Sequence, residues 1–211
     1  MAVNIGSTQN IVRENIEWCR IWVPGINQTD KPRILLIGDS ITEGYSGTVE
    51  KLLEGKAYVA RLSTSKSLGD PLYLDEVKMV LANTTFKVIH FNNGMHGGGY
   101  NETEYQRDYK KLVALLKKNA PGSKLICATT TAQRTSNQLD KLTSFTDRIK
   151  ARNDIAREAI KGQGIKIDDL YALLENRPEF YSQDGTHSND KGIEAEGQQV
   201  AKIIAEELAA K

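Results

Sequence analysis

The sequence predicts an α/β fold, a three-layer α/β/α domain built around a five-stranded parallel sheet. Short apolar segments alternate along the chain with longer segments whose apolar residues recur at helical spacing. Strands that alternate with helices form parallel sheets covered on both faces, and their crossovers are right-handed. The expected strands are residues 33–37, 57–61, 87–91, 124–130 and 165–167.

Three of the connecting segments have the period of an amphipathic helix. The residues expected on their buried faces are Tyr105, Tyr109, Leu112 and Leu116 in the first, Phe145, Ile149, Ala156 and Ile160 in the second, and Ile193, Val200, Ile204 and Leu208 in the third. Ligands of open parallel sheets bind at the carboxyl ends of the strands. We therefore expect the functional residues in the segments that directly follow strands.

The first 31 residues stand apart from this pattern. They hold both tryptophans, Trp18 and Trp22, and a Val-Pro-Gly sequence at positions 23–25 that interrupts any helix. We expect residues 1–31 to form an N-terminal arm that packs against a single domain, residues 32–211.

Composition and charge argue against several classes of function. The 28 basic and 27 acidic residues leave a net charge of +1, whereas nucleic acids and anionic membranes bind surfaces with a basic excess. The two cysteines make no disulfide framework, and no Cys/His spacing indicates a metal. Neither a membrane-spanning apolar run nor a signal peptide is visible, so the chain as written is expected in the cytoplasm. A chain that had lost a signal peptide would look the same, which leaves a secreted or periplasmic location open.

The first predicted strand leads into Gly38-Asp39-Ser40. A serine directly after a buried strand, at the start of a helix, has its hydroxyl near free backbone N–H groups that favour developing negative charge. Gly38 would permit a tight turn there. The alternative is that Asp39 or Ser40 only caps the next helix.

A second group of polar residues, Asp184-Gly-Thr-His187, lies near the end of the chain. A nucleophilic serine needs a base, and the base needs a partner that orients it. Histidine suits this role because its ordinary pKa is near neutrality. An Asp three residues before a His, across a glycine turn, can reach the same edge of the sheet. The alternative is a loop histidine among solvated capping residues.

The third group follows the strand at residues 87–91 and contains Asn92, Asn93, His96 and a run of glycines. Side-chain donors and glycine N–H groups at this edge could form an oxyanion hole. One alternative is a glycine-rich loop in which His96 only occupies space. The other is a loop that binds phosphate, although the spacing matches no phosphate-binding motif.

Taken together and in this order, the three groups resemble the SGNH (GDSL-type) serine hydrolases, from Pro32 to the C-terminus. The resemblance implies a flavodoxin-like sheet topology, Ser40 as nucleophile, and Asp184 with His187 as the rest of a catalytic triad. It also implies that the backbone N–H groups of Ser40 and Gly69 line the oxyanion hole.

The third group departs from the family pattern of glycine, any residue, asparagine, aspartate. Here Gly94-Met-His96-Gly97 places His96 where the oxyanion-binding asparagine belongs. We expect His96 to take over that role, with Asn92 or Asn93 as the alternatives.

The resemblance implies an ester hydrolase that works through an acyl-enzyme, with no cofactor or metal. It favours short, acetyl-like esters on carbohydrates or other small molecules as substrates, and implies neither a nucleic-acid nor a membrane partner. Three residues near the expected edge, Tyr45, Tyr100 and Arg134, could line a polar substrate pocket, unless they are ordinary loop residues. Other hypotheses are a non-catalytic carbohydrate-binding domain, an acyltransferase with the same triad, and a flavodoxin-like phosphate or nucleotide binder.

Overall fold

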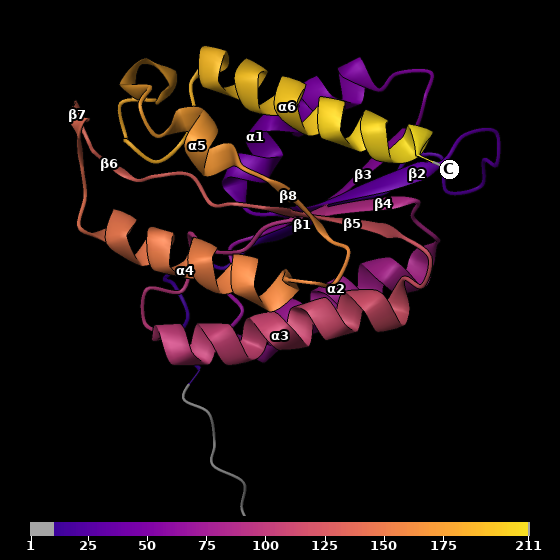
Figure 1. The fold of residues 1–211 in the computed structure, drawn as a ribbon, viewed down its shortest axis with the longest axis horizontal. Coiled ribbons are helices and arrows are strands. Elements are labelled where there is room, and N and C mark those ends of the chain that lie inside the picture. The colour runs from indigo at the N-terminus through magenta and orange to yellow at the C-terminus, as the bar shows by residue number, and fades with distance from the viewer. Residues whose placement is uncertain (1–10, 211) are drawn as a thin grey trace, which may run out of the picture.

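A computed structural model of the protein describes residues 11–210, in which helices cover both faces of a central sheet (Figure 1). The sheet has six strands in the order β1-β3-β2-β4-β5-β8. They are β1 (Cys19–Trp22), β2 (Arg33–Gly38), β3 (Tyr58–Thr64), β4 (Val88–Phe91), β5 (Lys124–Ala128) and β8 (Lys166–Asp168). All neighbouring strands are parallel except β1, which pairs antiparallel with β3.

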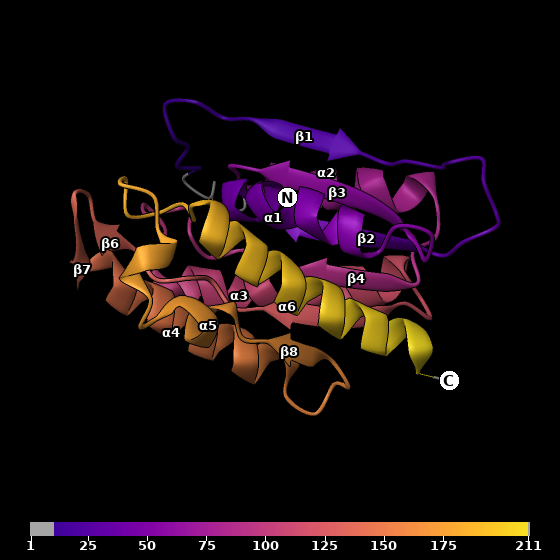
Figure 2. The same cartoon turned by 90° about the horizontal axis from the view of Figure 1, so that it is seen from above.

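The predicted α/β/α architecture is confirmed, and the predicted number of strands is corrected from five to six. The additional strand, β1, comes from the N-terminal arm and lies at the edge of the sheet (Figure 2). All four of its residues are exposed. β1 has only four residues, contains Arg20 and is followed closely by Pro24, so the longer apolar run that reveals a buried strand is missing there.

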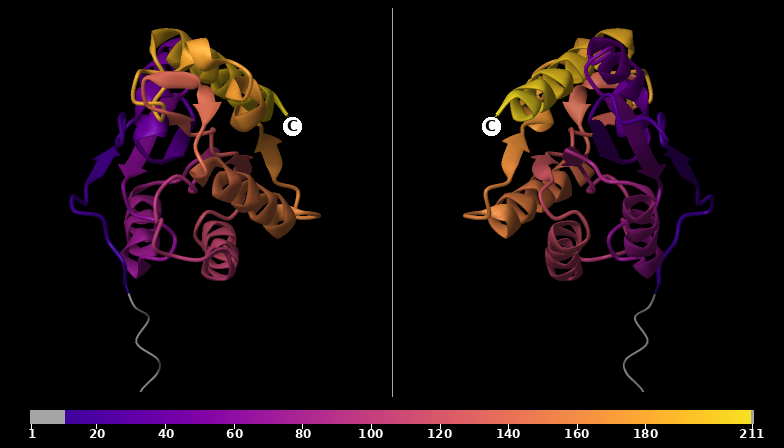
Figure 3. Two further views of the ribbon diagram at one scale, coloured as in Figure 1. Left: turned by 90° about the vertical axis from the view of Figure 1, so that its left-hand side faces the viewer. Right: turned by 90° about the vertical axis from the view of Figure 1, so that its right-hand side faces the viewer.

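The helices form the two outer layers (Figures 1 and 3). One layer holds α1 (Ser40–Leu52), α5 (Leu170–Leu174) and α6 (Asp190–Ala209), and the other holds α2 (Pro71–Asn83), α3 (Glu102–Asn119) and α4 (Phe145–Ile160). Successive residues of a strand point to opposite faces, so β2 contributes to both cores. Ile34 and Leu36 pack with α1 and α6, whereas Leu35 and Ile37 pack with α2, α3 and α4.

The predicted helix faces agree with the observed burial. The residues that are buried are Tyr105, Tyr109, Leu112, Leu116, Ile149, Ala156, Ile160, Val200 and Ile204. Phe145, Ile193 and Leu208 are partly buried. Among the described residues, no helix is long and apolar enough to cross a membrane.

A second, two-stranded sheet lies outside the main one. Its strands are β6 (Arg134–Thr135) and β7 (Gln138–Leu142), which pair antiparallel. The backbone N–H of Arg134 donates to the carbonyl of Gly185, and that of Asn137 donates to the carbonyl of Gln183. The β6–β7 hairpin therefore supports the turn that contains Asp184 and His187.

Candidate active site

Ser40 is the first residue of α1, directly after the carboxyl end of β2. Asp39 is the N-cap of this helix, and its carboxylate accepts a hydrogen bond from the N–H of Ile41 at 2.9 Å. The capping role is thus filled by Asp39, which leaves the Ser40 hydroxyl available for another partner. Gly38 is needed for space, because a Cβ there would lie 2.0 Å from Oγ1 of Thr42.

Asp184 and His187 lie on a tight turn just before α6. Gly185 adopts a φ of +75°, in the region that favours glycine. The Oδ1 atom of Asp184 accepts hydrogen bonds from the N–H of Thr186 at 2.8 Å and of His187 at 2.9 Å. The turn is closed by an isolated bridge between Tyr181 and Ser188. These bonds fix the two side chains relative to each other.

The fold brings Ser40 to His187 across 147 residues of sequence. The Oγ atom of Ser40 lies 2.8 Å from Nε2 of His187, and Nδ1 of His187 lies 2.7 Å from Oδ2 of Asp184. With the Nδ1 proton donated to the carboxylate, Nε2 is left as the acceptor for the serine hydroxyl. The three side chains form the hydrogen-bonded chain that defines a Ser-His-Asp triad.

The electrostatics of this chain favour an ionised Asp184. Burial alone would raise the pKa of Asp184, but hydrogen bonds from the His187 ring and from the N–H groups of His187 and Thr186 lower it overall. The side chains of Asp184 and His187 are 51% and 46% exposed. The site is therefore an open rim that solvent and a bulky molecule can reach.

Two loops flank Ser40, because β2 lies between β3 and β4 in the sheet. The loop after β3 carries Gly69, and the loop after β4 carries His96. Asn93 ties the loops together, since its side chain accepts from the N–H of Leu68 at 3.3 Å and donates to the carbonyl of Lys66 at 3.0 Å. Both predicted oxyanion loops thus meet at the edge that holds Ser40.

Gly69 has a clear steric requirement. A Cβ at this position would lie 2.4 Å from the ring of Tyr100, so only glycine allows the loop to lie on that ring.

The next residue, Asp70, is the N-cap of α2, and its carboxylate accepts from the N–H of Leu72. The pair Asp70-Pro71 is a typical start of a helix, although no helix is predicted here in the sequence analysis.

The alternative oxyanion donors Asn92 and Asn93 have other partners. The amide of Asn92 donates to the carbonyl of Ala128 at 2.8 Å and to Oγ1 of Thr130 at 3.0 Å. Both asparagines are more than nine-tenths buried. Asn92 thus uses both of its amide protons inside the protein, and Asn93 holds the two loops together.

Arg152, on α4, holds the backbone of the loop that carries His96. Its guanidinium donates to the carbonyls of Gly94 at 2.8 Å, His96 at 2.7 Å and Gly97 at 2.8 Å. The side chain is only 1% exposed, and burial lowers the pKa of Arg152 from its ordinary value. No local sequence pattern indicated this role, since Arg152 is distant from the loop in the sequence.

The three residues expected in a substrate pocket lie in the interior, which corrects that expectation. Tyr45 is 1% exposed, and its hydroxyl pairs with Thr42 at 3.0 Å. Tyr100 is 3% exposed and accepts a hydrogen bond from the arm. Arg134 is 4% exposed and donates to the carbonyls of Leu139 and Glu175. Side chains that are buried inside the protein offer no open surface to a sugar.

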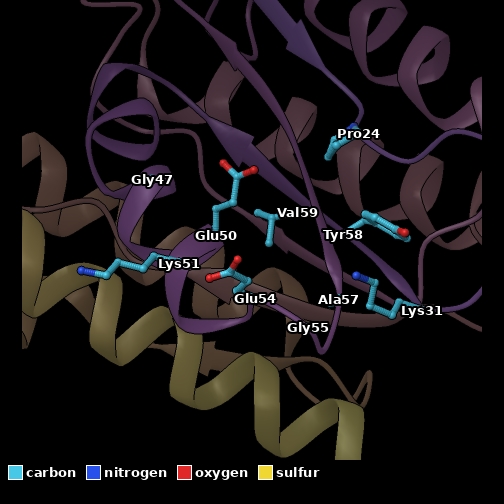
Figure 4. A pocket seen from close by; sticks show the side chains of 10 residues that line it. All are labelled: Pro24, Lys31, Gly47, Glu50, Lys51, Glu54, Gly55, Ala57, Tyr58 and Val59. Atoms are coloured by element: carbon cyan, nitrogen blue, oxygen red, sulfur yellow. The ribbon is translucent and has the colours of Figure 1, made fainter. Parts of the chain in front are cut away.

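A hollow of about 430 Å³ lies elsewhere, between the C-terminal half of α1 and the start of β3 (Figure 4). Its lining includes Glu50, Glu54, Lys31 and Tyr58. Glu50 is ten residues after Ser40 on the same helix, which corresponds to roughly 15 Å along the axis. The hollow is therefore separate from the triad. Within residues 11–210, no group of three or more His, Cys, Asp or Glu side chains could hold a metal ion.

Three of the solved structures that share the fold are named as lipases or esterases. A GDSL-like lipase from Bacteroides thetaiotaomicron is 18% identical, with a TM-score of 0.67 over 83% of this chain and 88% of that chain. An acetylxylan esterase from Geobacillus stearothermophilus is 16% identical, with a TM-score of 0.64 over 85% and 95%. An acetyl esterase variant solved with an acetate ion is 16% identical, with a TM-score of 0.67 over 84% and 98%.

The sequence itself matches no protein-family model and no curated protein. The structural likeness nevertheless establishes the fold, because it extends over more than four-fifths of the chain. The chain has the α/β/α fold of the GDSL-type lipases and esterases, as the sequence motifs predicted.

Proposed function

We propose that the protein is a serine hydrolase that cleaves carboxylic esters through an acyl-enzyme intermediate. The observation that carries this proposal is the chain of two short contacts, Ser40 to His187 at 2.8 Å and His187 to Asp184 at 2.7 Å. A hydroxyl becomes a nucleophile when an adjacent base accepts its proton and a third group orients that base. Here the three groups are in contact and at the edge of the sheet where ligands bind.

In the first step, Nε2 of His187 takes the proton as Ser40 attacks the ester carbonyl. Asp184 holds the imidazole and stabilises its positive charge. The oxyanion of the tetrahedral intermediate is held by the N–H groups of Ser40 and Gly69 and by His96. His187 then protonates the leaving alcohol. In the second step it activates a water molecule, which releases the acid and regenerates Ser40.

Short acyl groups on carbohydrate are the substrates that we propose. Two of the similar structures are named as an acetyl esterase and an acetylxylan esterase, and the first was solved with an acetate ion. The half-exposed Asp184 and His187 also support the proposal, because an open rim admits an ester whose alcohol half is a bulky sugar or polysaccharide.

A fluorophosphonate probe, which labels activated serines, tests the proposed chemistry. We expect labelling of the wild type and none of Ser40→Ala, with labelling at least ~10³-fold slower in His187→Ala. Ser144→Ala is the matched control, because Ser144 is exposed and caps no helix through its side chain. A folded wild-type protein that resists the probe would contradict the proposed function.

Acetylated sugars and chromogenic esters of increasing acyl length test the substrate class. We expect kcat/KM to be highest for acetyl esters and to fall as the acyl chain lengthens. Product analysis with a competing sugar alcohol separates hydrolysis from acyl transfer. Free acetate as the main product supports the hydrolase, whereas acetylation of the added sugar as the main product overturns it.

A further inference from the structure

The two tryptophans of the chain lie on one face of the segment that forms β1, at the edge of the sheet (Figure 2). Trp22 is the last residue of β1, and Trp18 extends the ladder, since the N–H of Ser65 donates to its carbonyl at 3.1 Å. Alternate residues of a strand point to the same side, so Trp18 and Trp22 share a face at a separation of roughly 13 Å. Trp22 is 54% exposed, and Trp18 is partly exposed. Two large aromatic side chains are therefore open to solvent along one line.

Two arginines connect the tryptophan rings to the first turn of α1. The guanidinium of Arg61 lies 5.8 Å from the centroid of the Trp22 ring, and that of Arg20 lies 5.8 Å from the centroid of the Trp18 ring. Nε of Arg61 lies 3.4 Å from Oε2 of Glu43, and Nη1 of Arg20 lies 3.7 Å from Oε1 of the same carboxylate. These contacts hold both rings in place, which reduces the entropy that is lost when a ligand binds to them.

The polar groups of this surface keep part of their hydrogen-bonding capacity. The contact of Arg61 with Glu43 is longer than an ordinary hydrogen bond, and among the described residues Oε2 of Glu43 accepts no hydrogen bond. The side chains of Arg61 and Glu43 are 25% and 23% exposed. A polar atom without a hydrogen bond is costly when it is buried, so Glu43 and Arg61 are candidates for contact with a ligand.

This surface lies next to the proposed nucleophile. Ser40 and Glu43 are three residues apart on α1, a spacing that places the Cβ atoms of a helix about 5–6 Å apart. In the sheet, Gly38 lies opposite Ser63, and Ser63 lies opposite Arg20. Because neighbouring strands are about 4.8 Å apart, the backbone of Arg20 lies roughly 10 Å from that of Gly38. A molecule whose ester lies at Ser40 can therefore reach the tryptophans with the part that extends beyond the ester.

The chemistry of the surface fits linked sugars. An aromatic ring packs on the apolar face of a sugar ring, while a guanidinium and a carboxylate can form hydrogen bonds with the hydroxyls at its edge. A long acyl chain would need a continuous apolar surface, which the charged groups of Arg61 and Glu43 interrupt. The separation of Trp18 from Trp22 exceeds the length of one sugar ring, so the surface fits an oligosaccharide better than a single sugar.

We propose that Trp18, Trp22, Arg61 and Glu43 form a subsite that binds the sugar chain to which the ester is attached. This inference rests on the proposed ester hydrolysis and extends it, because it makes the alcohol half of the substrate an oligosaccharide or polysaccharide. Trp and Arg are the side chains that most often dominate binding energy at an interface. The subsite supplies the aromatic contacts that the buried Tyr45 cannot provide.

Kinetics with two acetyl esters test the subsite. Acetylated xylo-oligosaccharide can reach the tryptophans, whereas para-nitrophenyl acetate is too short to do so. Truncation of an anchoring aromatic residue weakens binding about tenfold, so Trp22→Ala should raise KM for the oligosaccharide by that factor with kcat unchanged. Its kinetics with para-nitrophenyl acetate should match those of the wild type, which also shows that the variant is folded. Trp22→Phe keeps a flat ring and should retain most of the affinity.

Ile21→Ala is the matched control, because Ile21 is the neighbour of Trp22 on β1, is 37% exposed and points to the opposite face. We expect its kcat and KM to stay within about twofold of the wild type for both esters. A wild-type KM of Trp22→Ala for the oligosaccharide would overturn the subsite. An equal rise in KM for para-nitrophenyl acetate would also overturn it.

Tryptophan fluorescence gives a second readout that needs no change in the subsite. Both tryptophans of the chain belong to it, so their emission reports on this surface alone. We expect acetylated xylo-oligosaccharide to change the emission of Ser40→Ala and to shield it from acrylamide quenching. No effect at concentrations above the KM of the wild type would overturn the proposal. Emission that changes with protein concentration, and not with sugar, would overturn it in favour of a contact between copies.

Failure of the subsite and failure of the proposed hydrolysis give different results. If only the subsite is wrong, the wild type still cleaves para-nitrophenyl acetate, and Ser40 still reacts with the fluorophosphonate. A folded wild type that neither cleaves this ester nor reacts with the probe would instead remove the proposed function, and the subsite with it.

Discussion

Gly185 lies directly against the backbone of Arg134. The N–H of Arg134 donates to the carbonyl of Gly185 at 2.6 Å, and a Cβ on Gly185 would lie 2.2 Å from the carbonyl oxygen of Arg134. This contact joins the β6–β7 hairpin to the turn that carries Asp184 and His187. The position of the histidine therefore depends on a hairpin that contributes no residue to the triad.

The first prediction follows from that contact. Gly185→Ala introduces both a clash and an unfavourable positive φ, so the turn must shift and separate His187 from Ser40. We expect kcat to fall at least ~10²-fold, since small displacements of reacting groups are costly. Gly162→Ala is the control, because Gly162 has a φ of +71° with nothing near its Cβ position. It should cost about 1 kcal/mol of stability and leave activity intact. Full activity in Gly185→Ala would show that the turn can adapt.

The second prediction concerns Asp184. In Asp184→Asn the amide oxygen can still accept from the backbone of the turn, but the negative charge that holds the His187 tautomer is lost. We expect kcat to fall ~10³–10⁴-fold with an unchanged circular dichroism spectrum. Asp190→Asn, which alters an exposed residue in the first turn of α6, should stay close to the wild type. Equal activities of the two variants would remove Asp184 from the mechanism.

The third prediction concerns Glu196, whose side chain is fully buried under the site. Burial first, and then the negative charges of Asp39 and Asp168, raise the pKa of Glu196 from its ordinary value of 4.5 to about 8, although a hydrogen bond with Ser188 acts in the opposite direction. Between these two pH values, the unfolded chain has released a proton that the folded protein keeps. Stability should therefore fall as the pH rises from 4.5 to about 8 and then level off.

Glu196→Gln should remove this pH dependence. The change that it causes in the free energy of unfolding should be more favourable at pH 8 than at low pH by a few kcal/mol, since each pKa unit corresponds to about 1.4 kcal/mol. Urea denaturation at several pH values measures the difference. The exposed Glu194→Gln should follow the wild-type curve. A wild-type stability that rises between pH 5 and 8, with the same rise in Glu196→Gln, would mean that other groups dominate.

The fourth prediction concerns Arg152. Arg152→Met leaves three loop carbonyls without their donor, so we expect a loss of about 2–4 kcal/mol in the free energy of unfolding. The freed loop should also displace His96, with a loss of activity that remains at temperatures where the variant is folded. Arg20→Met removes a guanidinium that is 69% exposed and lies 3.7 Å from its partner Glu43, so it should cost less than about 1 kcal/mol. Similar losses of stability and activity in both variants would contradict the role of Arg152 in holding the loop that carries His96.

The apolar strands and amphipathic helices could be predicted because each depends on a local pattern. β2, β4 and β8 match their predicted ranges to within one residue. β3 extends to Thr64, three residues beyond the prediction, because Ser63 and Thr64 are buried polar residues that the apolar pattern does not mark. The β6–β7 hairpin was missed since its residues are mostly polar.

The meeting of Ser40 and His187 could also be anticipated, because the sheet topology brings all segments after strands to one edge. The interior positions of Tyr45 and Arg134 could not be anticipated from the sequence. A tyrosine or arginine in the sequence suggests an exposed polar group, whereas Arg134 is buried with two of its guanidinium nitrogens donating to backbone carbonyls. Likewise, the contact of Glu14 with His96 depends on the path of the arm, which no local pattern encodes.

The antiparallel pairing of β1 with β3 has a consequence for the behaviour of the molecule in solution. Without β1, the outer backbone groups of β3 would be free to pair with a strand of another copy. A chain cut before Val23 should therefore become prone to aggregate as its concentration rises. The four-residue β1 thus replaces the seven-residue β3 as the exposed edge of the sheet.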